Sequence, residues 1–200
     1  MAEKPLNLFL SASVPISGRA DGKYLVTADV IAIRDAVIAL ASVVMPHYRL
    51  IWGGHPSITP LIANVLRHSN RDVNECVTLY QSRFFVKEFP KENKDVERVV
   101  ITEALEDMGK SLELMRRKMI VENDFVAAVF IGGMNGVEEE YKMFVENHPN
   151  AKVIPVASTG AAALILYESN KDRFDERLKT DLAYSSLFKD ILMTHERDGK

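Results

Sequence analysis

The feature that most constrains the fold is an uninterrupted apolar run at residues 125–131, FVAAVFI, which ends directly in Gly132 and Gly133. A strand that is apolar at every position must be covered on both faces, as the central strands of a parallel sheet are. Shorter β-rich runs alternate with amphipathic stretches along the rest of the chain, as crossover connections between parallel strands require. We therefore predict an α/β protein, a Rossmann-like three-layer sandwich with a mostly parallel central sheet and helices on both faces.

The same patterns place the individual elements. We predict strands at residues 6–10, 48–52, 76–80, 98–102, 125–131 and 152–157, and an irregular loop with one edge strand at 84–95. Helices are predicted at 28–44, from about 60, and at 105–122, 160–167 and 181–194. Thr27 or Asp29 should cap the first helix, and Thr59 should cap the second, with Pro60 at its first position. No repeat or linker divides residues 1–200, so we predict a single domain in which 171–200 form a charged C-terminal helical extension.

Composition excludes several classes of protein. The chain has 200 residues, of which 47% are hydrophobic and 26% charged, values that exclude disordered and fibrous proteins. Lys and Arg number 25 against 28 Asp and Glu, so there is no positive surplus, and we expect no direct nucleic-acid binding. Cys76 stands alone, so no intramolecular disulfide can form. No apolar run reaches the length of about 18 residues that a membrane span needs, so we expect a cytoplasmic protein that makes no membrane contact.

Small and polar residues follow four of the predicted strands. In an open parallel sheet, ligands bind beyond the carboxyl ends of the strands, and glycines there let the backbone approach a phosphate. A helix start after such a loop adds free N–H groups and a positive dipole end. The sequence therefore predicts an anion site at this edge, although glycines at such turns can also be purely structural. The residues concerned are Ser11-Ala12-Ser13, Gly53-Gly54-His55-Pro56-Ser57-Ile58-Thr59, Gly132-Gly133-Met134-Asn135-Gly136 and Ser158-Thr159-Gly160.

Charged residues lie on both sides of the central run. Asn135 and Glu138 have the spacing of a helix capping box, which would give Glu138 a structural role. Glu139 or Glu140 is then placed to face a ribose hydroxyl or a glycosidic carbon; the alternative is a solvated acidic helix start. Arg116 and Arg117 provide either a bidentate anion clamp or a solvated helix face.

His55 is the one histidine in a predicted ligand loop, where its imidazole could contact a phosphate or a base. No second His or Cys stands at metal-ligand spacing beside it, so we expect no metal site and no cofactor. Ser11 lacks the Gly-x-Ser-x-Gly elbow and a supporting His and Asp, so its hydroxyl is interpreted as a binding group and not as a nucleophile.

The string Met115-Arg116-Arg117-Lys118-Met119, followed by Asp124, the apolar strand and Gly132-Gly133-Met134-Asn135-Gly136-Val137-Glu138-Glu139-Glu140, resembles the signature of the SLOG superfamily. That group includes the lonely-guy enzymes formerly called lysine decarboxylases, the DprA fold and the sensor domain of TRP-melastatin channels. In the lonely-guy enzymes an Arg and a Glu of this signature serve hydrolysis of the N-glycosidic bond of a nucleoside monophosphate. By the resemblance, Arg116 matches their Arg and Glu140 matches their Glu.

The sequence also departs from that signature. Ile131 replaces a proline, Asn135 adds one residue to the loop, and Val137 stands where a threonine would donate a hydroxyl to phosphate. The loss of that hydrogen bond is worth about 1.5–3 kcal/mol if the site is buried. The loops at 53–60 and 155–161 look more like stand-alone SLOG proteins of prokaryotic defence and nucleotide-signalling systems, for which the resemblance implies sensing or processing of a nucleotide-derived ligand.

Three functions follow as expectations. The first is binding, or sensing, of a nucleotide or nucleotide-derived small molecule at the strand ends. The second is an N-glycoside hydrolase acting on a nucleoside 5′-monophosphate, in which Arg116, Glu140 or Glu139 would be catalytic. The third is an adaptor module that uses the charged C-terminal helices. The resemblance also implies a homodimer or higher homo-oligomer, for which residues 105–122 and 181–194 could supply the interface.

Overall fold

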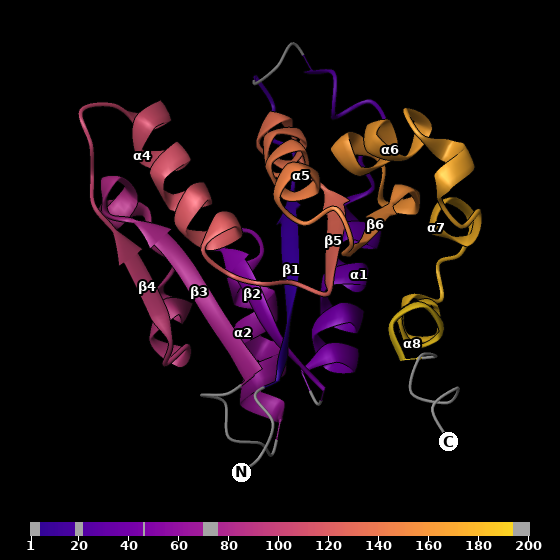
Figure 1. Cartoon of the computed structure of the whole chain (residues 1–200), viewed down its shortest axis with the longest axis horizontal. Helices are drawn as coiled ribbons and strands as arrows, with labels where there is room; N and C mark the ends of the chain where they lie inside the picture. Colours follow the sequence, from indigo (N-terminus) through magenta and orange to yellow (C-terminus); the bar gives the residue numbers. More distant parts are fainter. Residues whose placement is uncertain (1–4, 19–21, 46, 70–75, 194–200) are drawn as a thin grey trace.

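The computed structural model describes residues 5–18, 22–45, 47–69 and 76–193. Six parallel strands form one sheet in the order β4-β3-β2-β1-β5-β6, which confirms the predicted α/β class (Figure 1). The strands are β1 (Leu6–Ser13), β2 (Tyr48–Gly53), β3 (Val77–Ser82), β4 (Val99–Thr102), β5 (Ala127–Gly132) and β6 (Lys152–Val156). The main helices are α1 (Val30–Val44), α2 (Thr59–His68), α4 (Met108–Arg116), α5 (Asn135–Asn147), α6 (Ala161–Glu168), α7 (Arg177–Thr180) and α8 (Tyr184–Met193).

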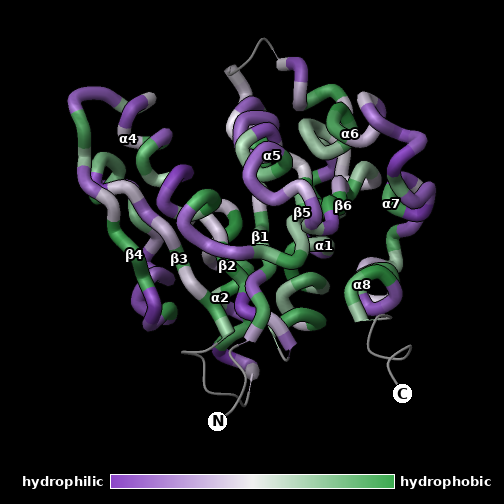
Figure 2. The backbone as a smooth tube through the Cα atoms, viewed as in Figure 1, coloured by the Kyte–Doolittle hydropathy of each residue, from purple (hydrophilic) through white to green (hydrophobic). Residues whose placement is uncertain are grey.

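The sheet is covered on both faces by apolar side chains. Successive residues of a strand point to opposite faces. In β1, Leu8 and Leu10 therefore join a core shared with α1, α2 and α8, while Phe9 joins one shared with α4, α5 and α6. Phe9 stacks on Phe144 of α5, with ring centroids 5.6 Å apart. Figure 2 shows hydrophobic residues along much of β1, β2 and β5 and hydrophilic ones on parts of α4 and α5.

The predicted central strand is present, although it begins two residues later, at Ala127, and ends one residue later, at Gly132. All six residues of β5 are buried, and β5 pairs with β1 on one side and β6 on the other. β1 is longer than predicted, because it runs to Ser13 and pairs there with Gly132. Residues 11–13 are therefore part of a strand and not of a loop.

Several helix starts differ from the predictions. Asp29 does cap α1, since its carboxylate accepts from the N–H of Ala32 at 2.9 Å. The residue before α2 is Ile58, with no side-chain cap, so Thr59 is its first residue and not its N-cap. Residues 84–95 hold no strand; they contain two 3₁₀ helices, η2 (Arg83–Glu88) and η3 (Lys91–Asp95).

The helix predicted at 105–122 is shorter and ends in a π-helical turn. Asp107 caps α4, and η4 (Arg117–Val121) continues it with the wider π geometry. The side-chain amide of Asn123 donates to the carbonyls of Lys118 and Met119, at 3.2 and 2.9 Å, and so satisfies acceptors that the wider turn leaves free. Such turns often occur at functional sites, and this one follows Arg116 directly.

The charged C-terminal segment contributes to the core. Leu187, Phe188 and Ile191 of α8 are buried in the cluster that α1 lines, and Lys152 Nζ donates to the carbonyl of Ile191 at 2.8 Å. Residues 194–200 lie outside the described residues. The apolar face of α8 is thus used within the chain, and the expected homo-oligomer stays a prediction. No helix in the described ranges is long and apolar enough to cross a membrane.

Candidate functional site

A serine and two charged residues from distant segments meet where β1 ends. The hydroxyl of Ser11 donates to Oε2 of Glu140 at 2.6 Å. The other oxygen of that carboxylate, Oε1, accepts from Nε of Arg116 at 3.2 Å. Ser11 is 1% exposed and the side chain of Glu140 15%, so this contact is shielded from water. Both carboxylate oxygens of Glu140 are therefore fixed by donors of the chain itself.

Arg116 is held by two carboxylates of α5. Besides its bond to Glu140, its Nη1 pairs with Oε2 of Glu139. The third nitrogen, Nη2, lies against the first turn of α5, because a Cβ built on Gly136 would be 2.9 Å from it. The guanidinium is thus directed at the start of α5, and a side chain at position 136 would displace it.

The third acid of this run, Glu138, has a different role from the one predicted. Met134 precedes α5 and no side chain caps it, so Asn135 and Glu138 do not form a capping box. The carboxylate of Glu138 instead accepts from the hydroxyl of Tyr24 at 3.1 Å and from Nζ of Lys23 at 3.3 Å. Burial, followed by the Glu138 carboxylate, raises the pKa of Tyr24. The hydrogen bond from Glu138 raises the pKa of Lys23. No pattern in the sequence predicted that Lys23 and Tyr24 would contact Glu138.

Two of the predicted phosphate-binding N–H groups are already satisfied. The N–H of Gly132 donates to the hydroxyl of Thr159 at 2.9 Å, and that hydroxyl donates to the carbonyl of Val156 at 2.6 Å. The N–H of Gly133 donates to the carbonyl of Ser13 at 2.8 Å. Thr159 is fully buried, so it ties the end of β5 to the end of β6 and does not face a ligand.

The turn after β6 is occupied in the same way. The N–H of Ala161, first in α6, donates to the hydroxyl of Thr27 at 3.0 Å. Gly160 has a φ of +70°, and a Cβ there would lie 1.8 Å from the carbonyl oxygen of Thr27. The hydroxyl of Ser158 lies 3.2 Å from that of Tyr184 on α8. The Ser158-Thr159-Gly160 turn therefore packs against the segment before α1. The carbonyl of Thr27 fills the space on the Cβ side of Gly160 and leaves no room for an anion there.

The start of α5 differs from the end of β5 and the start of α6, because a group of successive N–H donors stays unpaired there in the described ranges. The N–H groups of Met134, Asn135 and Gly136 have no hydrogen-bond partner in the part of the chain that the structure describes. Gly133 reaches this turn with a φ of +87°, and a Cβ on it would lie 2.2 Å from Cγ2 of Val137. A glycine is required at that position, and the unpaired N–H groups at the start of α5 lie beside Arg116, where the partial positive charge of a helix start favours an anion.

The Gly53-Gly54 loop is closed by side chains of the protein. A Cβ on Gly53 would lie 3.2 Å from Cε of Met115, and one on Gly54 would lie 1.8 Å from Nε2 of Gln81. Gln81 is 3% exposed at the end of β3 and donates to the carbonyl of Gly54 at 3.2 Å. The sequence did not single out Gln81, because an amide inside an apolar strand carries no spacing pattern. These glycines permit close packing in this structure.

Three other predicted ligand residues lie apart from the Arg116 cluster or are already engaged. Nδ1 of His55 is 2.8 Å from the hydroxyl of Ser57, whose oxygen accepts from the N–H of Val14 at 3.3 Å. Thr59 is fully buried and accepts from the indole of Trp52 at 3.4 Å. Arg117 is exposed, and no ion pair with it is found in the described ranges.

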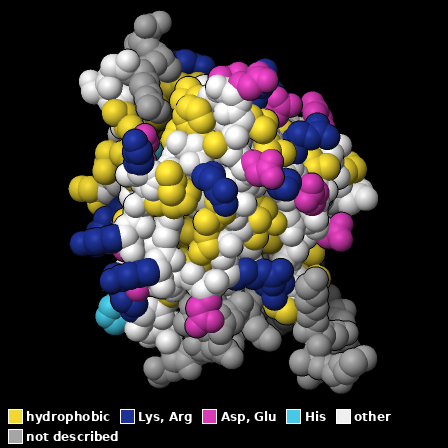
Figure 3. All heavy atoms as spheres, turned by 90° about the vertical axis from the view of Figure 1, so that its left-hand side faces the viewer, with side chains coloured by type: hydrophobic (Ala, Val, Ile, Leu, Met, Phe, Trp, Pro, Cys, Tyr) yellow, Lys and Arg dark blue, Asp and Glu magenta, His cyan; other side chains and the backbone are white. Residues whose placement is uncertain are grey.

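The face of the molecule that carries β4 and α4 has both charged and apolar side chains (Figure 3). Figure 3 shows acidic side chains gathered along the upper margin of the face that carries β4 and α4, with hydrophobic side chains in its middle. The exposed apolar residues of this side include Phe84, Val86, Ile101 and Met108. Among the described residues, no group of His, Cys, Asp and Glu side chains could hold a metal ion.

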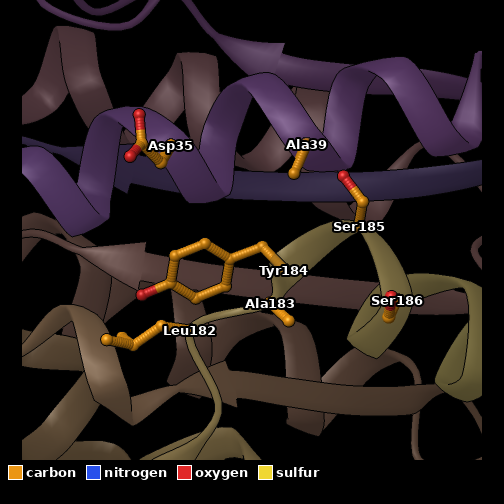
Figure 4. Close-up of a pocket in the computed structure, with 7 residues that line it drawn as sticks. All are labelled: Asp35, Ala39, Leu182, Ala183, Tyr184, Ser185 and Ser186. Carbon is orange, nitrogen blue, oxygen red and sulfur yellow. The ribbon is translucent and has the colours of Figure 1, made fainter.

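A cavity of about 270 Å³ lies elsewhere, between α1 and the start of α8 (Figure 4). It is lined by Asp35, Ala39 and residues 182–186. None of the predicted site residues lines it. The candidate site at the strand ends is therefore separate from this cavity.

Comparison with known proteins fixes the family. The model of the SLOG cluster3 family matches residues 23–192. The chain belongs to the SLOG cluster3 family. This SLOG protein is also similar in fold to the X-ray structure of TM1055, a structural genomics target, with a TM-score of 0.56 and 14% identity over 86% of this chain and 88% of that one. No curated protein matches the chain. The matched range includes the Arg116, Glu139 and Glu140 cluster and all of α5, so the resemblance found from those residues is confirmed.

Proposed function

We propose that this SLOG protein binds a nucleotide or nucleotide-derived small molecule, with one phosphate at the start of α5 beside Arg116. The observation that carries the proposal is that the shielded guanidinium of Arg116 lies beside the N–H groups of Met134, Asn135 and Gly136, which have no hydrogen-bond partner among the described residues. Backbone N–H groups at a helix start and an arginine fork are both suited to phosphate oxygens. Family membership supports a nucleotide-related ligand in preference to another anion.

The N–H groups that are already hydrogen-bonded within the protein limit the number of phosphate groups that the site can bind. Thr159 and Thr27 occupy N–H groups of Gly132 and Ala161 that a longer phosphate chain would need. One phosphate group at α5 is what the remaining donors accommodate. Ser11, behind Glu140, then positions that carboxylate and does not bind the phosphate directly.

Direct titration tests this function. Correctly folded protein should bind members of a panel of nucleoside monophosphates, NAD fragments and cyclic nucleotides, as measured by calorimetry. Arg116→Lys should weaken binding of the best ligand about tenfold, because an ammonium cannot reproduce the bidentate fork. Arg98→Lys is the matched control, because Arg98 is exposed and directly precedes β4, at the opposite edge of the sheet. Absence of binding across the panel would refute the proposal.

A second function is hydrolysis of an N-glycosidic bond, and the 3.2 Å contact between Arg116 and Glu140 favours it. That carboxylate lies one turn beyond the proposed phosphate site, where a ribose would extend. In this function Glu140 stabilises an oxocarbenium-like ribosyl transition state, while Arg116 orients the substrate. The test is release of free base from nucleoside 5′-monophosphates, which Glu140→Gln should abolish while ligand binding is retained. Base release that persists in this variant would contradict the role.

A further inference from the structure

Resting on the proposed phosphate site, we infer that Glu139 is an internal competitor of the ligand, which occupies Arg116 until a phosphate replaces it. The two carboxylates that hold Arg116 are not equivalent. Glu140 has 15% of its side chain exposed and is bonded on its other oxygen by Ser11. Glu139 has 52% exposed, and Arg116 is its one ion-pair partner among the described residues.

The geometry of the guanidinium makes Glu139 the carboxylate that must leave. Nε of Arg116 is bound to Glu140, Nη1 to Glu139, and Nη2 lies against Gly136 at the start of α5. An anion on the α5 N–H groups therefore reaches Nη2 first. A bidentate contact along the end of the guanidinium also needs Nη1, from which the Glu139 carboxylate has to move.

Displacing the Glu139 carboxylate from Arg116 should change the free energy of unfolding little. An ion pair with one partner more than half exposed adds little to stability. Glu139 itself is solvated and can turn outward, whereas Glu140 is kept in place by Ser11. Glu139 thus lowers the affinity of the site for an anion. Its carboxylate neutralises the shielded Arg116 when no ligand is bound, and it repels a weakly charged anion that would take its place.

The decisive measurement is calorimetric titration with inorganic phosphate and with AMP as probes. Glu139→Gln should bind both about fivefold more tightly than the wild type, since the competing charge is gone and the side-chain size is kept. Glu146→Gln is the matched control, because it removes the same charge two helical turns along the same face of α5 from an exposed position. Equal affinities of the two variants would overturn the inference.

A double variant shows whether the effect passes through Arg116. In the Arg116→Lys background, Glu139→Gln should give less than half of its effect on affinity. A full effect there would mean that Glu139 repels the ligand only through space, and the competitor role would be wrong. If neither the wild type nor Glu139→Gln binds any probe, the proposed function itself fails; binding by wild type with no gain in Glu139→Gln overturns the inference alone.

Discussion

Oε2 of Glu140 receives the hydroxyl of Ser11 at 2.6 Å, across 129 positions of sequence. The two side chains should therefore be energetically coupled. Ser11→Ala removes the donor and leaves a shielded carboxylate oxygen without a partner, which should lower the free energy of unfolding by about 1–3 kcal/mol. Urea denaturation of Ser11→Ala, Glu140→Gln and the double variant measures this. A double variant whose loss equals the sum of the single losses would show that the contact does not contribute.

Thr159 links the ends of β5 and β6 through a hydroxyl that both accepts and donates. Thr159→Val keeps the shape but leaves the N–H of Gly132 and the carbonyl of Val156 unsatisfied. We expect a loss of about 2–4 kcal/mol in the free energy of unfolding, and near-native stability for Thr159→Ser. Equal stability of the two variants in urea titrations would contradict the assignment.

Gly160 and Gly18 separate the cost of a positive φ from the cost of a collision. Both have a positive φ, +70° and +80°, but a Cβ on Gly18 would meet nothing within 4 Å, whereas one on Gly160 would lie 1.8 Å from the carbonyl oxygen of Thr27. Gly18→Ala should cost about 1–2 kcal/mol and Gly160→Ala at least about twice that. Thermal or urea unfolding of the pair tests the difference. Similar losses for both would mean that residues 27–28 move aside easily.

Tyr184 should make the protein sensitive to alkaline pH. Burial raises the pKa of its phenol above the ordinary value, although the hydrogen bond with Ser158 opposes this. A folded-state pKa above the unfolded one gives stability that is complete below the unfolded pKa, about 10, and is lost as the pH rises through the folded one. Stability should therefore fall more steeply above about pH 10 in the wild type than in Tyr184→Phe. Parallel declines of the two proteins in alkaline urea titrations would rule this out.

The strands could be predicted because their signal is local. The run at 125–131 is apolar throughout, as a central strand requires, and β5 is indeed buried throughout, although Val126 just before it is 37% exposed. Helix caps were less predictable than strands. Asp29 caps α1 as expected, but the hydroxyl of Thr59 accepts from the indole of Trp52, and α2 has no side-chain cap. A hydroxyl can serve a helix start or a tertiary partner, and the sequence does not show which partner is near.

The candidate site was predictable in its residues but not in its pairings. The resemblance selected Arg116 and Glu140, which the structure brings within hydrogen-bond distance. Which glycine N–H groups stay unpaired depends on Thr27 and Thr159, whose hydroxyls arrive from other segments. Glycines at three strand ends looked equivalent in sequence, yet the N–H groups of Gly132 and Gly133 are bonded to other segments, whereas those of Met134, Asn135 and Gly136 have no partner in the described part of the chain.

The position of β1 between β2 and β5 has a consequence for how the protein is made. During synthesis, β1 can pair with β2 early, but its partner on the other side, β5, and the Glu140 that Ser11 contacts lie more than a hundred residues after β1 in the chain. Contacts of such long separation form late and slowly. Until then β1 has an open edge and Ser11 has no acceptor in α5. The cluster of Ser11, Arg116 and Glu140 can therefore form only after β5 and the first turns of α5 have been made.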